Sequence, residues 1–210
     1  KRAPASCVSS VTYPNAPRWY ELCDEWGLLV MSEAAVETHE AGARFTVDPS
    51  WAERYLERAR RMALQNKNHP SIFCWSLGNE AGIGPNFGAM AQWLREYDPT
   101  RVVHYNARGA SRGMTDFYGD MYPKLAWVRE LLSTPGVTAP LIMSEYAYQR
   151  GNSGSAVHEI WEEIDRLARF QGGFVWEWAD KALPHPDGDR AWAYGGDFGE
   201  AHVDESPGMV

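Results

Sequence analysis

The sequence predicts an α/β fold, in which repeated strand and helix units surround a parallel sheet. Two observations indicate this fold. Short apolar runs rich in β-branched residues alternate with longer segments of helical periodicity. Several of these runs end in acidic residues. In a barrel of parallel strands, the functional residues lie at such strand ends. At 210 residues and 44% hydrophobic content, the chain can bury one core, so we expect one domain near the lower size limit of a closed eight-stranded barrel.

Seven segments are predicted to be strands, because each is short, apolar and followed by a turn or a helical pattern. They cover residues 6–11, 28–34, 72–77, 102–105, 115–118, 141–145 and 173–178. Four of them place acidic side chains at or just beyond their C-terminal ends. These side chains are Glu33 and Glu37, Glu80, Glu145, and finally Glu177 and Asp180. The C-terminal ends of parallel strands meet at one rim, so we expect the carboxylates to gather there.

Helices are predicted in the longer intervals between strands. Residues 17–26 begin with a proline and stop at Gly27, as helices commonly do. A second helix begins at Asp48, whose side chain can cap the first amides, and has a proline in its first turn. Two more are predicted over residues 89–97 and 155–170. The last of these lines one face with Val157, Ile160, Trp161, Ile164 and Leu167.

Charge and hydropathy exclude several classes of partner. Acidic residues outnumber Lys and Arg by 28 to 20, so we expect no nucleic-acid surface and favour a neutral or cationic small ligand. The longest apolar runs are far too short to span a membrane, and no basic-then-apolar signal segment opens the chain. We therefore expect a soluble, cytoplasmic protein. Three cysteines without CxxC spacing, Cys7, Cys23 and Cys74, are predicted to be small buried side chains.

Two segments carry residues that could cleave a glycosidic bond. The run Trp75-Ser76-Leu77-Gly78-Asn79-Glu80-Ala81-Gly82 places an amide and a carboxylate at a strand end, and Ile142-Met143-Ser144-Glu145-Tyr146-Ala147 repeats the arrangement. One carboxyl group can protonate the leaving oxygen while the other attacks the anomeric carbon. Retention of configuration requires a pair roughly 5 Å apart. Either glutamate alone could equally be a structural cap, so the pair is the stronger indication.

These segments resemble the acid/base and nucleophile motifs of glycoside hydrolase family 2, whose members have a TIM (β/α)8 barrel. The resemblance covers nearly the whole chain. The Tyr-Ala after the nucleophile and the Gly-Asn-Ser that follows favour the β-galactosidase branch. The matching segments are Tyr13-Pro14-Asn15, residues 23–28, Glu37-Thr38-His39, Asn68-His69-Pro70-Ser71, residues 75–80, Glu145-Tyr146-Ala147, Gly151-Asn152-Ser153, residues 172–176 and residues 194–199.

The resemblance implies a retaining β-glycosidase that hydrolyses terminal β-D-galactosides by double displacement. Glu80 would be the acid/base and Glu145 the nucleophile. The implied substrate-binding residues are Asn79 at the sugar 2-hydroxyl, Tyr122 near the nucleophile, Trp176 as the floor of the sugar site, and Tyr148. The implied Mg²⁺ ligands are Glu37, His39 and Glu80. Two alternatives stay open: Glu37 and His39 could simply hydrogen-bond within a loop, and Tyr122 could be a packing residue of the rim.

The strand count predicts that the chain is a fragment. In the family the two glutamates follow the fourth and seventh strands, whereas here they follow the third and sixth predicted strands. The chain would therefore lack the first βα unit, and no long final helix follows Gly196. We expect residues 1–210 to be the catalytic barrel domain of a larger multidomain enzyme, with any homo-oligomer formed through the absent domains.

The sequence departs from the family pattern where the sugar is bound. Thr12 and Tyr148 stand where the family has histidines, and Pro207 stands at the asparagine of a sodium site, which we expect to be lost. A catalytically silent carbohydrate-binding barrel is one alternative. A β-glucuronidase is another, and it would need a basic residue facing the sugar carboxylate. The candidates for that residue are Lys124, Arg150 and Lys181.

Overall fold

The computed structural model describes residues 7–10, 14–107, 109–111, 113–148, 157–176, 182–185, 188, 192–193 and 197–199 of the chain. The chain divides into two compact units. The first comprises Lys1–Asp120 and Thr138–Ile142, and the second comprises Met121–Val137 and Met143–Val210. The division passes through two of the strands, β5 and β6.

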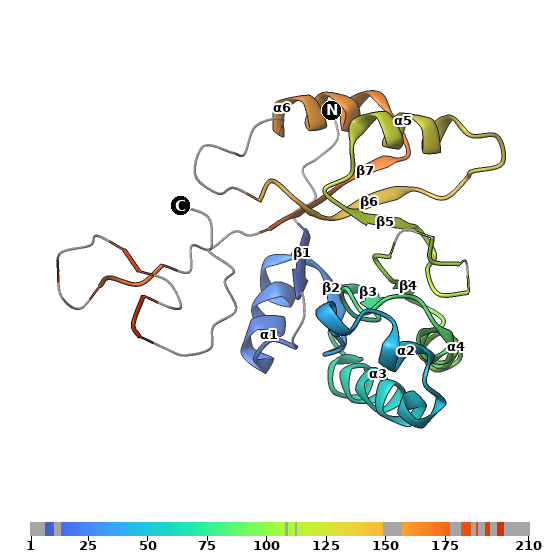
Figure 1. The fold of residues 1–210 in the computed structure, drawn as a ribbon, viewed down its shortest axis with the longest axis vertical. Helices are drawn as coiled ribbons and strands as arrows, with labels where there is room; N and C mark the ends of the chain where they lie inside the picture. Colours follow the sequence, from blue (N-terminus) through green and yellow to red (C-terminus); the bar gives the residue numbers. More distant parts are fainter. Residues whose placement is uncertain are drawn as a thin grey trace. The chain divides into compact units, whose positions relative to one another are not determined.

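The first unit is a run of strand and helix repeats, as the alternation of apolar and helical segments predicts. Its four strands pair in parallel in the order β1-β2-β3-β4. Figure 1 shows the helices of this unit grouped on one side of its sheet. In chain order the elements are β1 (Cys7–Ser10), α1 (Pro17–Trp26), β2 (Leu29–Glu33), η1 (His39–Ala41), α2 (Arg44–Val47), η2 (Pro49–Trp51), α3 (Ala52–Asn66), β3 (Ile72–Ser76), α4 (Pro85–Tyr97) and β4 (Val102–His104).

Local sequence signals explain where α1, α3 and α4 begin and where α1 ends. Helix α1 starts with Pro17 and stops at Gly27, which adopts φ 69° and donates its N–H to the Cys23 carbonyl. The Asp48 side chain accepts a 2.9 Å hydrogen bond from the Ser50 amide, so the predicted cap is confirmed. The first turn after it is a 3-10 turn, η2, and the α-helix proper begins at Ala52. Helix α4 begins four residues before its prediction, since Pro85 occupies its first turn.

The core of the first unit is rich in aromatic rings. Phe87 of α4 lies 4.0 Å from the Tyr105 ring and 5.3 Å from the Tyr55 ring, measured between centroids. Trp75 of β3 is fully buried, and its indole N–H donates a 2.9 Å hydrogen bond to Asp98. Cys23 and Cys74 are also buried, which confirms the expectation for these two cysteines.

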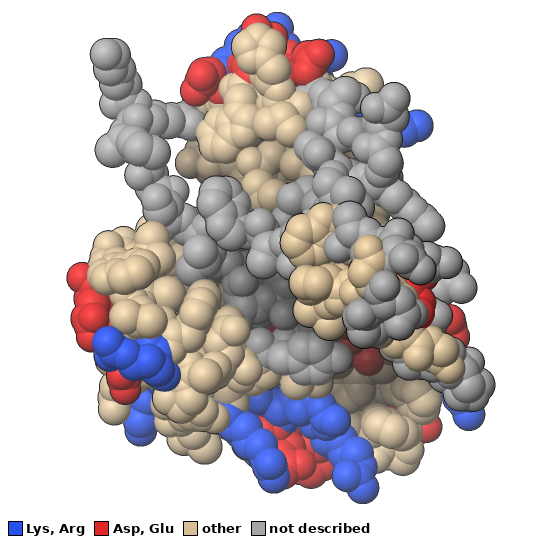
Figure 2. Space-filling model, turned by 90° about the vertical axis from the view of Figure 1, so that its left-hand side faces the viewer, with Lys and Arg blue, Asp and Glu red and all other residues tan. Residues whose placement is uncertain are grey.

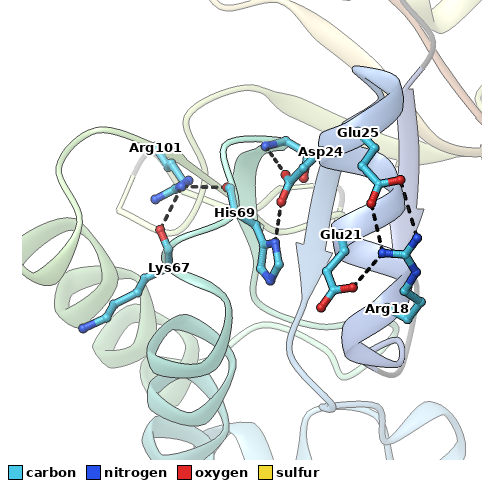
Figure 3. Close-up of polar contacts among 8 residues, drawn as sticks. Arg18, Glu21, Asp24, Glu25, Lys67, His69 and Arg101 are labelled. Atoms are coloured by element: carbon cyan, nitrogen blue, oxygen red, sulfur yellow. Dashed lines mark hydrogen bonds and ion pairs between the residues drawn. The ribbon is translucent and has the colours of Figure 1, made fainter.

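Polar contacts hold together the edge of the first unit at which its strands begin (Figure 3). Asp24 of α1 shares a 2.6 Å hydrogen bond with the His69 ring and accepts a 2.9 Å bond from the Ser71 amide. Arg101 donates to the carbonyls of Lys67 and His69 at 3.1 and 3.0 Å. These bonds fix the turn between α3 and β3, which contains the Asn-His-Pro-Ser segment of the family resemblance. In a barrel this edge contributes stability rather than chemistry.

A further sheet has three strands in the order β5-β6-β7, and the second unit contains β7 and most of β6. The amides of Tyr118 and Tyr122 donate to the carbonyls of Pro140 and Glu145 respectively. From the first of these bonds to the second, the residue numbers increase on both strands, as they do in parallel strands. The elements of this part of the chain are β5 (Tyr118–Met121), α5 (Leu125–Ser133), β6 (Leu141–Tyr146), α6 (Val157–Arg166) and β7 (Phe170–Val175).

Three element predictions need correction in this part of the chain. The fifth strand is displaced from 115–118 to Tyr118–Met121, because Asp116 uses its side chain to bind the Val103 amide at 2.7 Å. The seventh strand begins at Phe170 instead of residue 173, and α6 accordingly ends at Arg166. On the predicted apolar face of α6, Ile164 is buried but Trp161 is 44% exposed.

The described surface carries charged side chains of both signs. Figure 2 shows acidic and basic side chains beside one another on the face it presents. Opposite charges also pair along α3, where Arg60 contacts Glu53 and Arg61 contacts Glu57. Among the described residues, no helix has the length and apolar character to cross a bilayer.

Candidate active site

The segment after β3 carries Asn79 and Glu80. At residue 78 its backbone has a conformation that only glycine can adopt. Gly78 has φ 143°, and a Cβ there would lie 2.4 Å from the Val36 carbonyl oxygen. The Asn79 amide donates a 2.8 Å hydrogen bond to the same carbonyl, and Glu37 and Asn79 form a parallel bridge. The loops after β2 and β3 therefore lie side by side, as the prediction of a shared rim requires.

Glu80 has an uncommon backbone conformation. Its φ of 40° lies in the left-handed region, which residues other than glycine, asparagine and aspartate seldom adopt. Its side chain is 32% exposed, and Oε2 lies 3.3 Å from Nε2 of His39. Such conformations persist where the surrounding structure enforces them, and they are frequent in active sites.

Neighbouring side chains hold the loop around Glu80. The Thr46 hydroxyl donates a 2.5 Å hydrogen bond to the Ala81 carbonyl, and the Tyr105 hydroxyl donates one of 2.5 Å to the Gly82 carbonyl. Burial raises the pKa of Tyr105 above its ordinary value, so the phenol stays neutral and keeps this donor. Burial lowers the pKa of His104, one residue earlier, to about 3, so this imidazole is neutral at physiological pH.

Asn79 lies between two polar side chains. Its Nδ2 donates a 3.2 Å hydrogen bond to Oε1 of Glu37, and its Oδ1 accepts a 2.5 Å bond from Nδ2 of Asn106. Asn79 is 4% exposed and Asn106 is 5% exposed. Glu33, in contrast, lies within the sheet, where its carboxylate accepts a 2.7 Å bond from the Ser76 hydroxyl and the residue is 3% exposed.

In the second unit, Glu145 is held by Tyr122. The Tyr122 hydroxyl donates a 2.8 Å hydrogen bond to Oε2 of Glu145, and the Tyr122 amide donates a 2.9 Å bond to the Glu145 carbonyl. Glu145 lies near the end of β6 and is 7% exposed. Tyr122 directly follows β5 and has φ 48°. Tyr122 therefore contacts Glu145 through both its side chain and its backbone.

The residues after β6 and β7 complete this part of the site. The Trp176 amide donates a 2.9 Å hydrogen bond to the Tyr146 carbonyl, so the indole-bearing residue is fixed beside the end of β6. Ala147 has φ 64°, and the chain turns there before Tyr148, which is half-buried. Tyr122, Glu145 and Trp176 thus come together at the C-terminal ends of the three strands.

The predicted metal ligands fit magnesium in type, since two carboxylates accompany one imidazole. His39 and Glu80 are adjacent, whereas the Glu37 carboxylate is bound to Asn79. No group of three or more His, Cys, Asp or Glu side chains in the described part of the chain is placed to hold a metal ion.

Several predicted residues lie outside the described part of the chain. They are Thr12, Arg150, Glu177, Asp180, Lys181 and the segment 203–208 with Pro207. Lys124 is described, and it is an exposed residue at the start of α5.

Asn106 and Tyr105 follow β4 directly and were not predicted as site residues. The prediction was based on acidic residues at strand ends, whereas these two residues are an amide and a phenol. Their position directly after a strand could have indicated them as site residues, because the residues that follow each parallel strand lie at the same rim.

The comparisons with known proteins agree with this architecture. A family model described as Glycosyl hydrolases family 2, TIM barrel domain, matches residues 2–209. A β-galactosidase of Vibrio vulnificus strain YJ016 is 43% identical over 210 residues, which are 93% of this chain and 20% of that protein. A β-galactosidase of Alteromonas mediterranea is 45% identical, over 95% of this chain and 21% of its own length. The chain thus spans about a fifth of the length of these relatives.

Solved structures of β-glucuronidases share the fold. The enzyme of Faecalibacterium prausnitzii aligns with a TM-score of 0.64 at 23% identity, over 83% of this chain and 37% of that chain. The enzyme of Ruminococcus gnavus, in complex with a C6-substituted uronic isofagomine, aligns with a TM-score of 0.66 at 18% identity, over 86% and 38%. At these identities the likeness establishes the TIM-barrel fold alone. Together with the family match, it shows that this chain belongs to the TIM barrel domain of the family 2 glycosyl hydrolases.

Proposed function

We propose that this chain carries the catalytic residues of a retaining β-glycosidase that acts on terminal β-D-galactosides. The observation that supports this most directly is the Tyr122–Glu145 contact. A carboxylate that is 7% exposed, at the C-terminal end of a parallel strand, accepts a 2.8 Å hydrogen bond from a phenol on the neighbouring strand end. This contact orients the carboxylate, and an oriented carboxylate at a strand end can act as a nucleophile.

The proposed mechanism has two steps, and each glutamate has a defined role in both of them. In the first step the Glu145 carboxylate attacks the anomeric carbon while Glu80 gives its proton to the departing glycosidic oxygen. A covalent glycosyl ester on Glu145 results, and the aglycone leaves as an alcohol. In the second step Glu80 takes a proton from water, the water oxygen attacks the anomeric carbon, and Glu145 is released as a carboxylate. Trp176 would stack against the apolar face of the sugar.

A galactoside is proposed as the substrate because the relatives, which are 43–45% identical to this chain, are named β-galactosidases. A β-glucuronidase is the second candidate, because the solved structures named above are of that kind. That activity would need a cation at the sugar carboxylate, for which Lys124 is the described candidate.

We further propose that residues 1–210 are one domain of a larger enzyme, and that the chain lacks the first βα unit and the last helix of the barrel. The support is that Glu80 follows the third strand and Glu145 lies in the sixth, and that the relatives are about five times longer. Extension of the chain would then be needed to complete the barrel.

Magnesium is also proposed, with Glu37, His39 and Glu80 as its protein ligands. When bound, its positive charge would favour the ionised form of neighbouring carboxylates. We expect a chelator to lower the rate of glycoside hydrolysis and added Mg²⁺ to restore it. A rate that is unchanged after exhaustive chelation would remove Glu37 and His39 from the site.

The roles of the two glutamates are tested with two variants of the full-length enzyme. We expect Glu145→Gln to abolish turnover of every substrate. Glu80→Gln should retain hydrolysis of aryl glycosides with acidic leaving groups, since these need little protonation. Initial rates on nitrophenyl β-galactoside and on an alkyl galactoside distinguish the two cases, and Glu159→Gln on the exposed face of α6 is the matched control.

Three outcomes would contradict parts of the proposal. Equal losses on both substrates in both variants would refute the division of roles. Preference of the unmodified enzyme for nitrophenyl β-glucuronide would support the second candidate. A folded, full-length protein that binds sugar and hydrolyses no glycoside would indicate a silent binding barrel.

A further inference from the structure

We propose that Asn106 is a positioning residue that fixes the side-chain amide of Asn79 for contact with the sugar 2-hydroxyl. The inference rests on the proposed function and on the role that the family resemblance implies for Asn79, which is a contact with that hydroxyl. It adds a residue from the end of β4, a strand to which that function assigns no role.

The contact between the two amides is short and buried. Nδ2 of Asn106 lies 2.5 Å from Oδ1 of Asn79, and the two residues are 5% and 4% exposed. A neutral hydrogen bond in such surroundings is stronger than one in water, and removal of the donor leaves a buried oxygen unsatisfied.

The hydrogen bonds also determine which way the Asn79 amide points. A carboxylate can only accept, so the side of Asn79 that faces Glu37 at 3.2 Å must be its NH₂ group. Its oxygen then faces Asn106, whose NH₂ group donates to it. A flip of Asn79 would oppose oxygen to carboxylate on one side and NH₂ to NH₂ on the other.

In this arrangement the NH₂ group of Asn79 can donate a second hydrogen bond. Its NH₂ group has two hydrogens, and the contact with Glu37 uses one of them. The second hydrogen is then available for a hydroxyl oxygen of the sugar. A contact of this kind to the 2-hydroxyl strengthens as the oxocarbenium-like transition state forms, so its orientation affects the rate of the chemical step.

Backbone pairing holds the two asparagines in place. The Leu77 amide donates a 2.9 Å hydrogen bond to the His104 carbonyl, which keeps the residues after β3 beside those after β4. The Asn79 amide is bound to Val36 on its other side at 2.8 Å. The alignment of the two amides therefore depends on the sheet, and a substitution at Asn106 can change the Asn79 side chain without displacing its backbone.

The test removes the donor at residue 106 and compares two substrates. Asn106→Leu keeps the approximate size of the side chain and has no N–H. On nitrophenyl β-galactoside we expect kcat/KM of the full-length enzyme to fall about tenfold, mostly through kcat. On the nitrophenyl 2-deoxy-β-galactoside, which has no 2-hydroxyl, we expect the variant and the unmodified enzyme to agree within about twofold.

Two further variants separate positioning from folding. Asn106→Ser retains a shorter O–H donor, so we expect it to recover part of the loss on the galactoside. Asn86→Leu is the matched control, because Asn86 is a buried amide that donates at 2.9 Å to the carbonyls of Phe45 and Asp48, away from Asn79. Any loss it causes should be equal for the two substrates. Melting temperatures show which variants are folded.

The outcomes are distinct. A loss confined to the substrate with a 2-hydroxyl supports the inference. Equal losses on the two substrates in folded Asn106 variants would overturn it while leaving the proposed function intact. If the unmodified enzyme hydrolyses neither substrate, the proposed function fails, and the inference fails with it.

Discussion

Asp98 illustrates how single residues stabilise the first unit. One carboxylate oxygen accepts hydrogen bonds from Trp75 and Arg101 at 2.9 and 2.6 Å, and the other accepts one from the Thr100 hydroxyl at 2.5 Å. Burial alone would raise the pKa of Asp98, but the hydrogen bonds from Thr100, Arg101 and Trp75 outweigh it and lower the pKa to about 2. Asp98 therefore joins β3, the end of α4 and the start of β4 through its charge.

The sign of this shift predicts how stability depends on pH. The folded pKa lies below the unfolded value of 3.8, so the stabilisation is present above pH 4 and is lost as the pH falls towards 2. We expect Asp98→Asn to lower the free energy of unfolding by about 2 kcal/mol at neutral pH. Urea unfolding of both proteins from pH 7 to pH 2 measures this difference. A difference that stays constant across that range would contradict the role assigned to the charge.

At the residue scale, the sequence predicts which residues belong to the candidate site better than it predicts which side chains they contact. The positions of Glu80 and Glu145 at strand ends were sufficient to propose them as site residues, whereas Tyr122 was proposed from the family resemblance. The partners of Asn79 were not predictable, because its contact with Asn106 depends on how β3 and β4 align. A spacing of 27 residues between the two asparagines carries no periodic signal.

At the scale of elements, the close approach of β6 and β7 depends on Gly173. A Cβ at this residue would lie 2.6 Å from Cβ of Met143 and 2.9 Å from its carbonyl oxygen. The two strands can keep their separation only if residue 173 has no side chain.

We therefore expect Gly173→Ala to destabilise the protein by about 2 kcal/mol, because the strands must separate or shift. Gly88→Ala is the matched control. Gly88 lies within α4 and a Cβ there meets no atom within 4 Å, so alanine should stabilise the helix by about 0.5 to 1 kcal/mol. Chemical denaturation of both variants measures these effects. If Gly173→Ala proved as stable as the unmodified protein, the packing assigned to β6 and β7 would be wrong.

Elements with strong local signals were predicted well, and the others were not. Helix α1 has a proline at its start and a glycine at its end, and its predicted bounds are confirmed. Strand β7 contains Gly172 and Gly173, which in the sequence favour a turn; the prediction ended the preceding helix at Phe170 and began the strand only at residue 173. Its start at Phe170 follows from tertiary packing, since that ring is fully buried.

For the whole molecule, the fold class followed from the order of strands and helices. The alternation predicted a parallel α/β barrel, and the family match and the TM-scores confirm a TIM-barrel fold. The missing βα unit remains a prediction, because it depends on counting strands against the family.

The fragment proposal predicts that activity requires a longer chain. We expect residues 1–210 to hydrolyse nitrophenyl β-galactoside at least about a hundredfold more slowly than a version extended to complete the barrel, since a misplaced site residue can cost that much. Initial rates of the two proteins, with circular dichroism to confirm folding, measure the difference. Equal activity of the two would refute the proposal that the barrel is incomplete.

The left-handed conformation of Glu80 has a consequence for engineering. A φ of 40° is a conformation that glycine and asparagine accept more readily than glutamate does. A library of variants selected only for heat resistance would thus tend to enrich Glu80→Gly or Glu80→Asn and to lose the carboxylate. Stability therefore competes at this residue with the acid/base role proposed for Glu80, so a useful selection must score both stability and activity in the same round.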